Sequence, residues 1–172
     1  IYKKKGDKHD PNSYRPITIL SCFGKLFTRI LNNRLTDFID LNQILSPAQA
    51  GFRKSFSTID NIFVIYNLMQ ILKCRKQKLY CAFIDFTKAF DTVWRVGLWQ
   101  KLQNIGIEGK FMNLVKSMYK NIKSCVQCNG DMSNYFPCNT GVRQGENLSP
   151  LLFSLFVNDI EKIGRASCRE RV

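Results

Sequence analysis

An acidic side chain at the end of an apolar run is the clearest chemical feature of this 172-residue sequence. The stretch 79–84 is apolar or readily buried, which predicts a strand, and Asp85 follows it directly. An ionised carboxylate in such a place is costly unless it is paired or bound to a cation. Two interpretations are open. Asp85 is either structural, capping a helix or pairing with Lys88 or Arg95, or it is a Mg²⁺ ligand whose site substrate phosphates complete.

The charge balance indicates what kind of partner the chain binds. Lys and Arg number 26 against 13 Asp and Glu, a formal net charge of +13. Such a surplus favours a polyanionic partner, nucleic acid before membrane, over the alternative of a merely soluble basic protein. No apolar run reaches the roughly 20 residues of a membrane span, and the opening "IYKKKGDKHD" has no signal-peptide pattern. We therefore expect an intracellular protein with no membrane partner.

The cysteines favour reduced thiols, because seven of them are scattered through a chain without a secretion signal. Cys125 and Cys128 have the spacing of a zinc-ligand pair. The sequence has no second such pair, and His9 is its only histidine, whereas a structural zinc site needs four ligands. We therefore predict that these two cysteines lie in a strand.

The elements that would position Asp85 follow from periodicity and punctuation. Apolar residues recur every three or four positions in the first helix, Ser57 and Asp60 resemble a capping box, and Asn129-Gly130 is a strong hairpin signal. The order predicts an α+β domain. The expected elements are helices at 22–39 and 58–73, the strand at 79–84, helices at 97–107 and 109–121, a hairpin about 129–130, and a helix from 149 to 163.

Four motifs in order carry a family resemblance: "NSYRPITILSCFGKLFTRILNNRL", "SPAQAGFRKSFSTIDNI", "FIDFTKAFDTV" and "GVRQGENLSPLLFSLFVNDI". Their order and spacing resemble the reverse transcriptase domains of non-LTR (LINE-type) retrotransposons. The resemblance implies an RNA-directed DNA polymerase with a right-hand fold, acting with an RNA template, a DNA primer and deoxynucleoside triphosphates. It places helical fingers at 1–78 and part of the palm, with its central antiparallel sheet, at 79–163. Residues 164–172 look like a non-native tail.

The third motif, by this resemblance, holds the catalytic centre. Asp85 corresponds to the first catalytic aspartate, and the carbonyl of Phe86 would also face the metal. Two Mg²⁺ ions are expected in the complete enzyme. Phe90 matches the aromatic steric gate that excludes a ribose 2′-hydroxyl, although the residue by itself, without the family context, favours an ordinary core phenylalanine. Asp91 is expected to be structural.

The substrate-binding residues come from the other motifs. Arg53 matches the arginine that grips the incoming triphosphate, and guanidinium suits phosphate. Arg15 is a looser match for a template or phosphate contact, with a solvated loop residue as the alternative. Gln144 would pack against the nascent base pair and Gly145 would allow close backbone approach. Arg143 would help to hold template and nucleotide. Asp85, Phe90, Arg53 and Gln144 should line one cleft.

The aromatic-x-Asp-Asp motif that supplies the other catalytic carboxylate in reverse transcriptases does not occur in the sequence. We therefore expect a truncated polymerase domain that is inactive by itself. The alternative is a non-catalytic RNA- or DNA-binding remnant. A telomerase-like or group II intron-type polymerase would share the chemistry, but the residues of the motif "FIDFTKAFDTV" favour a LINE-type element.

Overall fold

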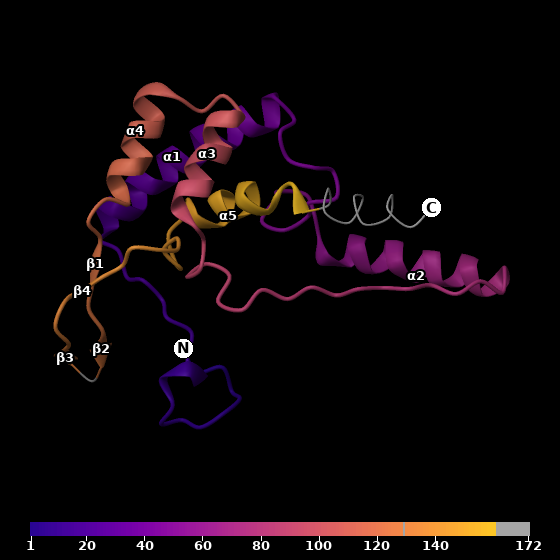
Figure 1. The fold of residues 1–172 in the computed structure, drawn as a ribbon, viewed down its shortest axis with the longest axis horizontal. Helices are drawn as coiled ribbons and strands as arrows, with labels where there is room; N and C mark the ends of the chain where they lie inside the picture. Colours follow the sequence, from indigo (N-terminus) through magenta and orange to yellow (C-terminus); the bar gives the residue numbers. More distant parts are fainter. Residues whose placement is uncertain (129, 161–172) are drawn as a thin grey trace.

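Residues 1–128 and 130–160 are described by the computed structural model, which places five helices, four short strands and a 3-10 turn in these ranges (Figure 1). The predicted α+β class is confirmed as helices with small antiparallel sheets. No helix within the described ranges is both long and apolar enough to cross a membrane. The elements are η1 (Pro11–Ser13), α1 (Cys22–Leu41), α2 (Thr58–Cys74), α3 (Arg95–Asn104), α4 (Gly109–Met118), β1 (Lys123–Ser124), β2 (Gln127–Cys128), β3 (Asp131–Met132), β4 (Phe136–Pro137) and α5 (Ser149–Val157).

The helix α1 begins where the sequence predicts, because Ser21 caps it by accepting a hydrogen bond from the Gly24 amide at 3.1 Å. Only its second half buries the expected apolar stripe, through Leu31, Leu35 and Ile39. The first half exposes apolar side chains, which include Phe23, Leu26, Phe27 and Ile30.

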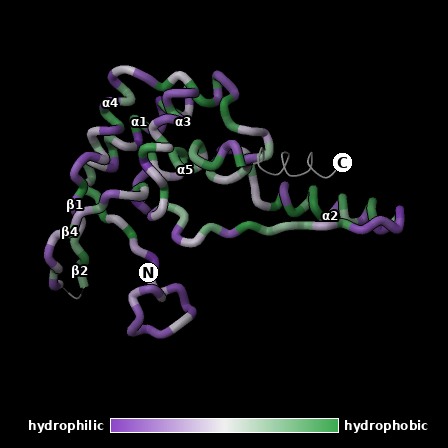
Figure 2. Tube along the Cα trace, in the orientation of Figure 1, coloured by the Kyte–Doolittle hydropathy of each residue, from purple (hydrophilic) through white to green (hydrophobic). Residues whose placement is uncertain are grey.

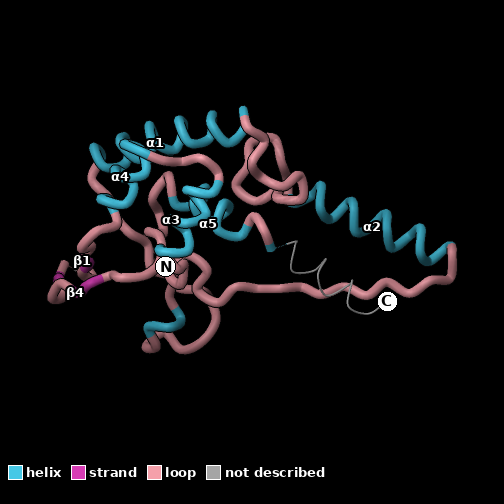
Figure 3. The backbone as a smooth tube through the Cα atoms, turned by 45° about the horizontal axis from the view of Figure 1, so that its top comes forward, coloured by secondary structure: helices cyan, strands magenta, loops and turns pink. Residues whose placement is uncertain are grey.

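The hydrophobic core lies among α1, α3, α4 and α5, which gather in one body in Figures 1 and 3. Helix α3 packs on α5 and on α4. The apolar side chains that are fully enclosed there include Leu98 and Leu102 on α3 and Leu148 and Leu152 at and within α5. This core fixes the start of α5, which lies within the fourth motif.

Helix α2 extends away from that body alongside the segment that follows it (Figures 1 and 3). Its predicted capping box is confirmed, with Ser57 and Asp60 bonded reciprocally. None of its residues is buried. Both α2 and the segment beside it are largely hydrophobic, as Figure 2 shows, so this arm presents apolar surface to solvent.

The strand predicted at 79–84 is not formed, and this expectation was wrong. The residues are extended but unpaired among the described elements, and Tyr80 and Phe83 are 86% and 84% exposed. A strand exists only through its hydrogen-bonded neighbours, and no described segment runs beside this one in register. The apolar run therefore indicates that these residues can form a strand, but it does not identify a neighbouring strand for them.

The predicted hairpin about Gly130 is confirmed, and it projects from the helical body (Figure 1). Strand β1 pairs with β4 and β2 with β3, all antiparallel. Cys128 lies in β2 as expected, whereas Cys125 lies between β1 and β2. The last helix was expected to reach Ile163; α5 ends at Val157, and positions 161–163 and the tail 164–172 lie outside the described residues.

Candidate active site

Four phenylalanine rings join three of the sequence motifs. We call Phe52, Phe86, Phe90 and Phe153 the phenylalanine cluster. The rings of Phe90 and Phe153 stack with centroids 5.2 Å apart, and Phe52 meets Phe90 edge-on at 6.0 Å. Phe86 meets Phe153 edge-on at 6.1 Å. The loop that carries Arg53, the residue after Asp85, and the predicted steric gate therefore lie together on one side of α5.

Phe90 is held from its backbone as well as from its ring. Its carbonyl accepts a hydrogen bond from the Val142 amide at 2.7 Å, which ties the third motif to the fourth. The turn before it places Lys88 at a positive φ of 52°, and the amide of Asp91 donates to the Lys88 carbonyl at 2.9 Å. The half-buried ring is thus fixed on one face by Phe153 and at an edge by Phe52.

The Asp85 carboxylate is exposed, and neither proposed structural pairing occurs among the described residues. The ammonium group of Lys88 lies 3.4 Å from the Asn12 side-chain oxygen. Arg95 donates instead to three backbone carbonyls, including that of Gly141 at 2.8 Å. Nor does Asp85 cap a helix, since α3 begins ten residues later. The carboxylate is therefore free to bind a cation or solvent.

Its donor chemistry suits a hard divalent metal. A carboxylate oxygen of Asp85 and the carbonyl oxygen of Phe86 are the ligand types that Mg²⁺ takes, usually with several waters retained. No group of three His, Cys, Asp or Glu side chains gathers anywhere in the part of the chain that the structure describes. The donors present fit such an ion in kind.

The side chain of Arg53 is bound to the backbone of its own loop. Its guanidinium donates to the carbonyls of Ser46 and Gln49 at 3.2 and 3.3 Å and lies 4.1 Å from the ring centre of Phe56. Both hydrogen bonds are at the long end of the usual range, so a phosphate could replace them at small cost.

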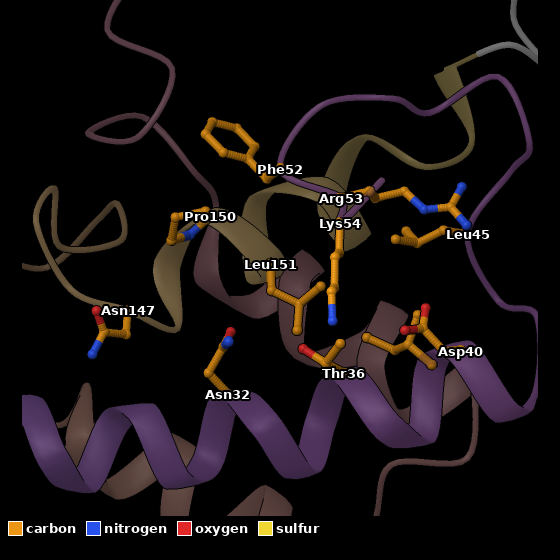
Figure 4. A pocket seen from close by; sticks show the side chains of 11 residues that line it. Asn32, Thr36, Asp40, Leu45, Phe52, Arg53, Lys54, Asn147, Pro150 and Leu151 are labelled. Atoms are coloured by element: carbon orange, nitrogen blue, oxygen red, sulfur yellow. The ribbon is translucent and has the colours of Figure 1, made fainter. Parts of the chain in front are cut away.

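A polar cavity of about 160 Å³ adjoins this loop, between α1 and the start of α5 (Figure 4). Lys54 and Arg53 both line it; in Figure 4 Lys54 points toward Thr36 on α1, whereas the guanidinium of Arg53 lies toward Leu45. The cavity is therefore lined by the predicted triphosphate-binding residue Arg53 and by its neighbour Lys54. Its walls include Asn32 and Asp40 of α1.

Gln144 and Gly145 form a turn against the N-terminal segment. The Thr18 amide donates to the Gln144 carbonyl at 2.8 Å. Gly145 has φ +104°, and a Cβ on it would lie 2.9 Å from the Thr18 carbonyl oxygen, so a larger residue would clash. No hydrogen bond or ring contact joins Gln144 to the phenylalanine cluster within the described ranges. Arg15, nearby in sequence, is exposed.

The comparison with known proteins identifies the family. Residues 2–170 match the family described as reverse transcriptase (RNA-dependent DNA polymerase). The chain belongs to this family. A probable RNA-directed DNA polymerase from transposon BS of Drosophila melanogaster is 35% identical over 162 residues, which cover 93% of this chain and 18% of that protein.

Further relatives agree. The RNA-directed DNA polymerase from mobile element jockey of Drosophila melanogaster is 31% identical over 93% of this chain and 17% of its own length. The Pol polyprotein from retrotransposable element R2 of Popillia japonica is 28% identical over 93% and 22%. The predicted resemblance to reverse transcriptase domains of non-LTR retrotransposons is confirmed. The chain spans about a fifth of the length of these relatives.

Arg143 of this reverse transcriptase domain faces inward. Its guanidinium donates to the Met118 carbonyl at 3.0 Å, lies 3.9 Å from the Glu146 carboxylate, and sits 5.6 Å from the ring centre of Tyr119. These are contacts of a residue that holds the fold together. A role for Arg143 on template or nucleotide stays a prediction.

Sequence reasoning missed Glu146, which is 2% exposed. It accepts hydrogen bonds from the hydroxyls of Tyr119 at 3.0 Å and Ser149 at 3.5 Å. Burial raises the pKa of Glu146, and the nearby Arg143 opposes that rise. Burial, and secondarily the Glu146 charge, also raise the pKa of Tyr119. The available signal was an acid placed three residues before the start of the apolar helix α5.

Proposed function

We propose that this reverse transcriptase domain is part of an RNA-directed DNA polymerase of a non-LTR retrotransposon, which performs templated nucleotidyl transfer by a two-metal mechanism. Its substrates are an RNA template, a DNA primer and deoxynucleoside triphosphates. The observation that carries the proposal is the family match over residues 2–170, which contains the Asp85 motif. In the right-hand polymerase fold, residues 1–78 would be fingers and 79–163 part of the palm.

Asp85, with the carbonyl of Phe86, would hold Mg²⁺ in this proposal. Metal held there would supply activation of the primer 3′-hydroxyl and neutralisation of charge on the leaving pyrophosphate. The exposed, unpaired carboxylate supports the assignment, because the structural partners considered for it are engaged elsewhere.

The phenylalanine cluster supports the role of Phe90 as the sugar gate. A gate must keep its position when a ribose presses on it, and the ring is stacked on Phe153 and braced by Phe52. Arg53, on the same loop as Phe52, would exchange its two backbone carbonyls for the triphosphate. Gln144 and Gly145 would meet the nascent base pair, and Arg15 the template.

The experiment uses a longer polymerase that includes an aromatic-x-Asp-Asp segment, assayed for primer extension on RNA with Mg²⁺. We expect Asp85→Asn to abolish extension while leaving the fold and most RNA affinity intact, because it removes a metal ligand and few phosphate contacts. Asp91→Asn, six residues along the same motif, is the matched control and should stay active. Near-normal extension by Asp85→Asn would show that the carboxylate is structural.

Sugar selection provides a second readout. Phe90→Val should leave extension partly intact and admit ribonucleotides, because the ring acts by exclusion and bears no charge in the transition state. Unchanged rejection of ribonucleotides would remove Phe90 from the gate role.

A second candidate function is nucleic-acid binding without catalysis. It rests on the charge of +13, which attracts phosphates whether or not Asp85 carries a metal. The ion pairs between described side chains are Lys101–Asp159 and Arg143–Glu146, so most of the surplus cations are available. Activity of the longer polymerase, lost in Asp85→Asn, decides for the enzyme.

A further inference from the structure

The turn from Arg143 to Glu146 is anchored on two sides. Toward the N-terminal segment, it is hydrogen-bonded and closely packed against Thr18. Toward α4, the buried side chain of Glu146 reaches the hydroxyl of Tyr119, the residue that follows the helix. Gln144 lies between these two anchors.

The α4 anchor is a small polar network inside the core. Oε2 of Glu146 lies 3.0 Å from the Tyr119 hydroxyl and 3.5 Å from that of Ser149. Oε1 is 3.9 Å from Nη1 of Arg143 and accepts no hydrogen bond among the described residues. The ring of Tyr119 lies under the guanidinium of Arg143 and that of Arg95, at 5.6 and 5.1 Å. Such a carboxylate has few alternative positions.

A carboxylate is a costly choice for stability alone. Replacing a buried ionic group with apolar side chains of similar volume is often neutral or stabilising. What Glu146 supplies is a fixed orientation of its side chain, because the hydroxyls that donate to it lie on fixed elements, at the end of α4 and the start of α5. The amide of Glu146 also donates to the Arg143 carbonyl at 3.3 Å, which closes the turn.

We propose that Glu146 is a positioning residue, which acts through Tyr119 to fix the turn that presents Gln144 to the nascent base pair. The task assigned to Gln144 rests on the proposed polymerase function. The fixing of the turn does not, and the two parts are tested separately.

The first test measures the turn directly, by hydrogen exchange of the Thr18 amide in the chain. Glu146→Ala should speed this exchange by about tenfold relative to the amides of α3, because the buried hydrogen bond from Tyr119 is lost. Glu146→Gln keeps an acceptor for Tyr119 and should restore most of the protection. The matched control is Ser154→Ala, which removes a buried hydroxyl of α5 that is bonded to the Gly51 carbonyl at 3.5 Å.

A merely structural Glu146 predicts another pattern. The Thr18 and α3 amides would then accelerate by the same factor, and Ser154→Ala would behave like Glu146→Ala. Either that pattern or unchanged Thr18 exchange in Glu146→Ala would overturn the proposal.

The second test measures binding of an RNA–DNA duplex with a recessed primer end against a blunt duplex of the same length. Gln144→Ala and Glu146→Ala should each reduce the preference for the recessed end by about tenfold, and the double variant should lose no more than either. Independent, additive losses would overturn the link between the two residues. If the wild type binds no duplex while Thr18 exchange responds as expected, the polymerase function fails and the positioning of the turn stands.

Discussion

Gly145→Ala should destabilise the domain through a specific clash with Thr18. At φ +104° a side chain is strained at a cost of about 1–3 kcal/mol. Its Cβ would also lie 2.9 Å from the Thr18 carbonyl oxygen, so the segments must separate. Separation weakens the Thr18–Gln144 hydrogen bond, which is worth about 1 kcal/mol. We expect the free energy of unfolding to fall by about 2–4 kcal/mol in total.

Gly109→Ala is the matched control, because Gly109 also has a positive φ, of 63°, but nothing lies within 4 Å of its Cβ position. It should cost about 1–2 kcal/mol from conformation alone. Urea-induced unfolding, followed by tryptophan fluorescence and circular dichroism, measures both variants. If the two substitutions cost the same, the contact with Thr18 does not restrain the turn and the reasoning about its N-terminal anchor fails.

Three other predictions concern the core, the pH response and the charge. Leu102→Ala, at a fully buried site, should lower the free energy of unfolding by about 2–5 kcal/mol, whereas Leu68→Ala on the exposed arm should change it by less than about 0.5 kcal/mol. The pKa of Tyr119 is raised in the folded chain, so the unfolded chain loses the phenol proton at a lower pH. The free energy of unfolding should therefore fall as pH rises above about 10. Tyr119→Phe should remove this dependence when denaturation is measured over a series of pH values. The logarithm of the binding constant for single-stranded RNA, measured by fluorescence anisotropy, should fall linearly with the logarithm of the salt concentration, and a flat response would argue against phosphate contacts.

The helices could be predicted from the sequence because their signals are local. Ser21 and the Ser57–Asp60 box fix two helix starts through contacts within a few residues, and β2 and β3 pair where the Asn-Gly signal of the sequence predicts a hairpin. The strand before Asp85 failed for the opposite reason. Its six residues have the right composition, but pairing depends on another segment, and composition does not identify one.

The candidate site divides in the same way. The motif resemblance predicted that Phe90 matters, but the stacking on Phe153 depends on tertiary packing that no spacing reveals. By the motif resemblance Arg143 is expected to help hold template and nucleotide, and what the sequence did not reveal is that it donates to the Met118 carbonyl and lies beside Glu146. Side-chain chemistry indicates what a residue can bind; the fold decides which partner it meets.

Long-range hydrogen bonds at both ends of α5 affect how the domain folds while it is being synthesised. Asn147 bonds to the Lys25 carbonyl across 122 residues, and Asn158 accepts from the Ser46 amide across 112. Contacts so far apart in sequence require costly loop closure and form slowly, whereas single helices form from neighbouring residues. On a ribosome, which releases the chain from its N-terminus, α1 waits exposed until α5 emerges. Leu31, Leu35 and Ile39, which the second half of α1 buries in the finished core, stay exposed until then and make the nascent chain a substrate for chaperones.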